Sequence, residues 1–196
     1  MHSLGRTFAT VAAVLIAALL PSAALAQDDG LVREGYFEVR SASTELEDGV
    51  HRLDARLQLI LSSEALDALS SGVPLIIELQ AQVIRVRRLY FDGVDAEITK
   101  RFELEYRPLS ERYLVRNLNS GEQDSFATLY SALNSLGRIQ DLPLIDDSLL
   151  AAGKPHRVRL RALLQTQQYP APLRLLFFWR SQWQLKSEWL EWPLER

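Results

Sequence analysis

The stretch VHRLDARLQLIL, residues 50–61, decides the fold, because every odd position from 53 to 61 is apolar. The even positions from 52 to 58 carry charged or amide side chains instead. This period of two is typical of a β-strand with one buried face. A shorter strand candidate, YFEVR at residues 36–40, precedes it, and Asp48-Gly49 between the two favours a hairpin turn. The two stretches therefore predict a β-hairpin that turns its apolar face toward a core.

The rest of the chain continues in strands. We predict them at residues 75–83, 98–106, 113–118 and 158–164. The apolar phase changes near Val83, which indicates a β-bulge or a bend, since one extra residue exchanges the two faces. The last strand is expected to carry Trp183, Leu185 and Trp189 on one face, with another change of phase at Leu190.

Helical signals are short. Ser62 is a suitable N-cap for a helix that ends before Gly72. Asp124 or Ser125 opens a second helical stretch, 126–136, with apolar residues at helical spacing and Gly137 at its end. Residues 146–148 predict one further turn, in which the two aspartates cap free amides.

Seven or eight strands with few helices favour an antiparallel sheet, because parallel strands need crossover helices between them. We therefore predict a mainly β protein, an antiparallel β-sandwich with two or three short inserted helices; a partly open β-barrel is the alternative. The apolar phase of each strand predicts these core residues: Leu57, Leu59, Leu79, Phe102, Leu104, Leu160 and Trp183.

The N-terminus, residues 1–26, has the features of a secretory signal peptide. Arg6 supplies a positive charge, residues 8–20 form an apolar run, and Ala24-Leu25-Ala26 fits a signal peptidase site. We therefore expect periplasmic location and a single mature domain, residues 27–196. An uncleaved inner-membrane anchor is the alternative, and membrane contact is expected only in that case.

Composition excludes several functions. The chain has 196 residues and no cysteine, which rules out disulfides, thiol catalysis and thiolate metal sites. Without Arg6, the mature chain has 21 basic against 25 acidic residues, a net charge of −4, so nucleic acid is not an expected partner.

No group of residues predicts catalysis. The two mature histidines, His51 and His156, lie far apart without a second histidine nearby, so we expect surface positions at strand edges rather than a metal site. The chain contains neither a Gly-x-Ser-x-Gly elbow nor a glycine-rich phosphate loop. We therefore predict no catalytic, cofactor-binding or metal-binding residues, no cofactor, and a protein that is not an enzyme.

Two features form the candidate binding surface: Arg157, Arg159, Arg161, Phe178, Trp179 and Trp183. The arginines share one strand face at steps of about 6.6 Å and would suit an anionic glycan or lipid. Pairing with Glu97, Glu103 and Glu105 across strands is the alternative that we favour. The aromatic cluster favours a protein partner of the envelope, because exposed apolar patches mark contact sites.

Five stretches also resemble a known family: residues 106–115, 125–137, 157–161, 169–175 and 183–192. The most specific are Pro-x-Pro-Leu-Arg at 170–174 and Trp-x-Leu-x-Ser-x-Trp at 183–189. They resemble DUF4390, exported proteobacterial proteins with no established activity; Tyr169 stands where such proteins often have leucine. The resemblance brings no catalytic residues. Members are often encoded beside a membrane sensor kinase, which implies an accessory role.

Overall fold

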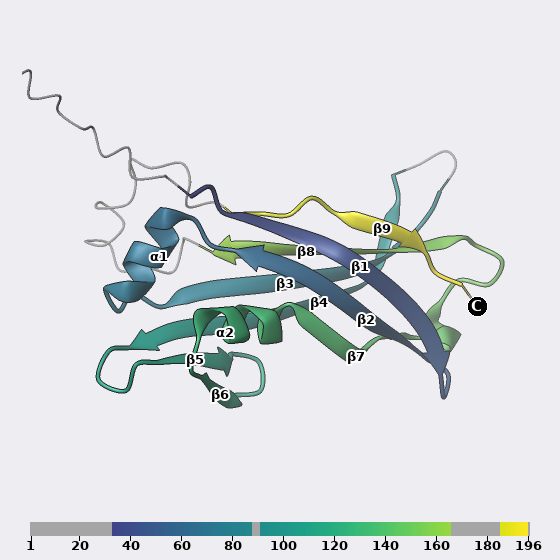
Figure 1. Cartoon of the computed structure of the whole chain (residues 1–196). Coiled ribbons are helices and arrows are strands. Elements are labelled where there is room, and N and C mark those ends of the chain that lie inside the picture. The colour runs from purple at the N-terminus through teal and green to yellow at the C-terminus, as the bar shows by residue number, and fades with distance from the viewer. Residues whose placement is uncertain (1–32, 88–90, 166–184, 196) are drawn as a thin grey trace, which may run out of the picture. The chain divides into compact units, whose positions relative to one another are not determined.

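The computed structural model describes residues 33–87, 91–165 and 185–195, which form two antiparallel sheets (Figure 1). The smaller sheet has the order β1 (Tyr36–Glu47), β2 (Val50–Ile60), β7 (Arg138–Asp146). The larger sheet has the order β6 (Gln123–Phe126), β5 (Arg112–Asn117), β4 (Gly93–Arg107), β3 (Leu75–Arg85), β8 (His156–Gln165), β9 (Leu190–Pro193). The sheets are not closed into a barrel, so the predicted β-sandwich is confirmed.

The β1–β2 hairpin forms at the predicted turn. Asp48 and Gly49 both have positive φ, 48° and 81°, between the register partners Glu47 and Val50. Positive φ at both central residues gives a turn whose twist matches that of the flanking strands. Asp-Gly supports this backbone because glycine meets no steric penalty there.

The core lies between the two sheets and contains most of the predicted residues. Leu57, Leu59, Leu79, Leu104 and Leu160 are buried. Phe102 is only partly buried, although it packs against the core, and Trp183 lies outside the described residues. The strands that contain these five leucines therefore bury the phase that their alternation predicted. The strand predicted to carry Trp183, Leu185 and Trp189 is not formed over its described residues, which make only an isolated bridge at Lys186, and β9 begins at Leu190.

Two short helices sit at strand ends. In α1 (Ser63–Ser70), Ser62 accepts a hydrogen bond from the Ala65 N–H, as predicted for its N-cap. In α2 (Leu129–Leu136), the N-cap is Thr128, so the predicted start near Asp124 was wrong. Residues 123–126 instead form β6, which pairs with β5. The predicted further turn is the 3₁₀ helix η1 (Asp147–Leu149), capped by Asp146.

The irregularity predicted near Val83 is present. The register between β3 and β4 shifts between Val83 and Ile84, and the unpaired extra residue is Asp95 of β4. The extra residue lies in β4 and not in β3, whose pairing with β8 has no shift, so the two faces of β3 are not exchanged. Val83 belongs to the core cluster, and Ile84 is buried outside it. Within the described part of the chain, no helix has the length and apolar character needed to span a membrane.

Candidate functional site

The three arginines of β8 face outward, because they alternate with the buried residues Val158, Leu160 and Ala162. Arg157 binds Asp92 at 2.7 Å and Glu191 of β9 at 3.1 Å. Arg159 and Arg161 donate through Nε to the glutamines beside them on β3, Gln82 and Gln80, at 2.8 and 2.7 Å. The predicted partners on β4 were wrong, because Glu103 binds Arg116 and Glu105 binds Arg107.

Trp189 completes this arginine row. The Cζ atoms of Arg159 and Arg161 lie 4.5 and 4.3 Å from the centre of its ring, which is the range of a cation–π contact. The guanidinium groups are thus held by side chains of their own sheet. The structure gives no specific support to a polyanion site on this strand.

Asp92 anchors the end of the row. Its Oδ1 accepts the backbone N–H of Arg87 at 3.0 Å, and Oδ2 accepts from Arg157. The backbone hydrogen bond from Arg87, and then the Arg157 guanidinium, lower the pKa of Asp92 and outweigh the opposite effect of desolvation. The carboxylate therefore stays ionised beside the row.

The aromatic half of the predicted surface, Phe178, Trp179 and Trp183, lies outside the described residues. Among the described tryptophans, Trp192 of β9 donates through Nε1 to Thr44 Oγ1 of β1 at 2.6 Å. This hydrogen bond joins the two sheets, so Trp192 has a structural role in the sandwich.

The two histidines of the predicted mature chain, His51 and His156, are both buried, which corrects the prediction of surface positions. His51 Nε2 lies 3.0 Å from Asp147 Oδ1, and His156 Nε2 lies 3.0 Å from Asp95 Oδ2. Asp95 also binds Arg85 at 2.8 Å. Each histidine thus joins segments distant in the sequence. Among the described residues, no three histidine or acidic side chains are grouped to hold a metal ion.

A groove of about 390 Å³ lies between the two helices and the end of β2. Its apolar lining comes from both helices and from β2: Leu66 of α1, Leu129, Tyr130 and Leu133 of α2, and Ile60 of β2. Tyr130 is 79% exposed, whereas Leu66, Leu129 and Leu133 are half-buried. The groove exists because β7 pairs with β2 only as far as Arg56 and leaves the following residues to α2.

The charge around this groove is positive. Arg33, Arg40 and Arg56 line it, and none of its described lining residues is acidic. Arg33 is placed by α1, because its backbone N–H donates to Ser63 Oγ at 2.8 Å. Arg40 is partly neutralised by Glu38, at 2.9 Å. An apolar floor with a basic rim suits a segment that carries apolar and acidic side chains.

The sequence did not single out this groove. Tyr130 and Leu133 fall at helical spacing, which indicates burial as readily as a surface, and Arg33 lies in no motif. The sequence feature that could have indicated the groove is the number of apolar residues in α2, which exceeds what this short helix buries. Ala132 and Leu136 are buried, but Leu129, Tyr130 and Leu133 are not fully covered.

Comparison with known proteins gives one finding. No curated protein and no solved structure matches the chain. The family described as Domain of unknown function (DUF4390) matches residues 35–193, from the residue before β1 to the end of β9. The match thus covers both sheets and both helices, and the chain belongs to the DUF4390 family.

Proposed function

We propose that the protein is a non-enzymatic accessory of the cell envelope that works in the periplasm and binds another envelope protein. The α1–α2 groove is the binding site, and an apolar, acidic segment of the partner is the ligand. The signal-peptide features of residues 1–26 support the location. The family's association with membrane sensor kinases makes such a kinase a natural candidate for the partner.

The observation that carries this proposal is an exposed aromatic side chain over an apolar groove rimmed by arginines. Tyr130 is 79% exposed on a short helix that already buries its other face. Tyrosine and arginine are enriched among residues that contribute most to binding at protein interfaces. Half-buried leucines around Tyr130 would lose their remaining contact with water when a partner binds, which favours association.

Site-specific photo-crosslinking in cells tests this proposal. A benzophenone amino acid replaces Tyr130 in the groove, and the matched control replaces Leu109, which is fully exposed in the turn after β4. We expect one discrete adduct in the periplasmic or membrane fraction from position 130 and none from position 109.

Charge reversal supplies the second arm. Arg33→Glu should greatly reduce the adduct from position 130, because it places a negative charge against the acidic segment. Arg101→Glu, at an exposed position of β4 in the larger sheet, should leave the adduct unchanged. Equal labelling from positions 109 and 130, or an adduct indifferent to Arg33→Glu, would refute the groove as the binding site.

A further inference from the structure

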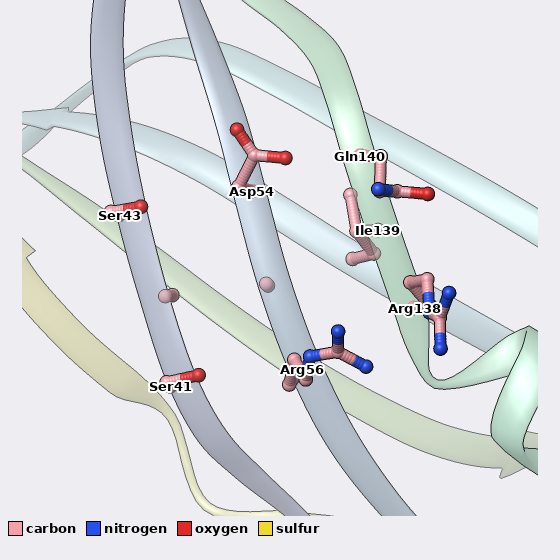
Figure 2. A pocket seen from close by; sticks show the side chains of 9 residues that line it. Ser41, Ser43, Asp54, Arg56, Arg138, Ile139 and Gln140 are labelled. Atoms are coloured by element: carbon pink, nitrogen blue, oxygen red, sulfur yellow. The ribbon is translucent and has the colours of Figure 1, made fainter.

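The outer face of the smaller sheet carries two arginines side by side. Arg56 of β2 and Arg138 of β7 are register partners, and Ser41 of β1 is the partner of Arg56 on its other side. Figure 2 shows Arg56 lying between Ser41 and Arg138 across the three strands. Both arginine side chains are exposed.

These two arginines differ from their neighbours on the same face. Arg40 binds Glu38 at 2.9 Å, and Arg52 binds Asp141 at 2.7 Å. Neither Arg56 nor Arg138 forms an ion pair or a side-chain hydrogen bond with any residue that the structure describes. Like charges directly opposite on neighbouring strands are destabilising. Such a departure from local pairing is expected where a sheet binds a ligand.

Two β-bulges flank the pair. The β1–β2 register shifts at Arg40, and the β2–β7 register shifts between Leu53 and Ala55, where Gln140 and Asp141 oppose Asp54. Asp141 has φ of 52°, in the left-handed region that some bulges and turns use. Bulges are common beside functional sites because they redirect side chains.

Between the bulges lies a hollow of about 290 Å³. Its polar lining includes Ser41, Ser43 and Gln140, whose hydroxyl and amide groups can donate hydrogen bonds. Its one acidic lining residue is Asp54, which precedes Arg56 by two residues on β2. The Asp54 carboxylate accepts a hydrogen bond from the backbone N–H of Asp141 at 3.3 Å. Figure 2 shows the serine oxygens directed toward β2.

We propose that Arg56 and Arg138 together bind a phosphate-type oxyanion, either as a free ion or as a lipid headgroup. Guanidinium groups recognise phosphate through two parallel N–H···O hydrogen bonds, and two of them can neutralise either the single charge of a phosphodiester headgroup or the double charge of free phosphate. The serine hydroxyls supply neutral donors to the remaining oxygens. Bound anion would also remove the repulsion between the two arginines, so binding should stabilise the fold.

This inference goes beyond the proposed function and can fail independently of it. Arg138 lines the hollow but not the α1–α2 groove, whereas Tyr130 lines only the groove. Arg56 borders both. The test therefore relies on Arg138.

The first measurement uses inorganic phosphate as the probe, at constant ionic strength so that general screening does not change. Protein purified after expression of the full chain is titrated by calorimetry and unfolded thermally with and without phosphate. We expect saturable binding and a raised Tm. Arg138→Gln should weaken binding about tenfold, since it removes one of the two charged hydrogen-bond donors.

The matched control is Arg116→Gln, which removes an arginine that is already paired with Glu103 on the larger sheet. It should bind phosphate as the unmodified protein does. Without phosphate, the Tm of Arg138→Gln should equal or exceed that of the unmodified protein, because a repulsion has been removed. This comparison separates loss of binding from loss of folding.

The second measurement distinguishes the two sources of the anion. Co-sedimentation with phosphatidylglycerol vesicles, displaced by inorganic phosphate, identifies a headgroup, whereas phosphate binding without vesicle binding identifies a free ion. Phosphatidylcholine vesicles are the uncharged control. The proposal is overturned if neither phosphate nor phosphatidylglycerol binds, or if Arg138→Gln binds them as tightly as Arg116→Gln does.

Discussion

Replacement of Gly137 by alanine should destabilise the protein, although the local backbone predicts the opposite. Gly137 ends α2 with φ of −77° and ψ of 2°, which any residue can adopt. At such a position, alanine usually stabilises a protein by about 0.4–1 kcal/mol, because it restricts the unfolded chain. The tertiary structure reverses this sign. A Cβ atom at Gly137 would lie 2.4 Å from the carbonyl oxygen of Leu57.

The magnitude follows from the distance that must open. Ordinary contact begins at 3.4 Å, so β2 and the end of α2 must separate by the difference from 2.4 Å, about 1 Å. This shift breaks the 2.7 Å hydrogen bond from Leu57 N–H to Gly137 O. A buried donor left without a partner costs about 1–3 kcal/mol. After the gain from the unfolded chain is subtracted, we expect a net loss of about 1–2 kcal/mol.

Urea unfolding measures this loss. With an m-value of about 2 kcal/mol per molar urea, the midpoint should fall by roughly 0.5–1 M while m stays constant. The control Ser135→Ala, at an exposed position of the same helix, should change stability by less than about 0.5 kcal/mol. An unchanged or raised midpoint for Gly137→Ala would show that α2 does not rest on the β2 backbone as described.

Two further predictions concern the core and the acidic end of the arginine row. Leu104 is fully buried between the sheets, so Leu104→Ala should reduce the free energy of unfolding by about 2.7–5 kcal/mol. The control Leu109→Ala, at a fully exposed position, should change this free energy by less than about 0.5 kcal/mol. Equal effects of the two substitutions would contradict the assignment of Leu104 to the core. The lowered pKa of Asp92 means that its ionised form stabilises the fold above the ordinary value of 3.8, and that this stabilisation is lost as pH falls below it. Tm measured against pH should therefore fall less steeply below 3.8 for Asp92→Asn than for the unmodified protein, and parallel curves would contradict a role for the Arg87 and Arg157 contacts.

The hairpin and the central strands could be predicted because each buries one face along its whole length. In β2 and β8 the alternation is continuous, and burial follows it residue by residue. The same logic missed β7. Its apolar residues Ile139, Leu142 and Leu144 lose the period of two, because the bulge at Gln140 and Asp141 changes the phase between them. A local pattern cannot reveal a strand whose bulge is fixed by its neighbour.

The start of α2 was misplaced for a related reason. Asp124 and Ser125 are good N-cap residues, yet they belong to β6, an edge strand with mostly exposed side chains. An exposed edge strand buries too little to impose alternation on its sequence, so capping preferences gave the stronger signal. Thr128 also satisfies the capping preference, and the pairing of β6 with β5 decides between them.

The candidate sites depended even more on topology. Outward arginines on β8 could be predicted, but their partners could not, because the sequence does not say that β8 lies between β3 and β9. The carboxylate beside Arg157 and Arg159 thus comes from Glu191 of β9 rather than from β4. The pair of Arg56 and Arg138 was equally hidden, since β7 itself was not predicted.

The junction between α2 and β7 connects both proposed sites. Gly137 closes the helix against the Leu57 carbonyl, and the next residue, Arg138, opens β7 beside Arg56. On one side of this junction α2 covers the end of β2 and forms the groove; on the other side β7 pairs with β2 and forms the hollow. One close backbone contact therefore sets the position of Tyr130 in the groove and of Arg138 in the hollow. Because glycine alone permits that contact, the geometry of both sites depends on a residue that lines neither.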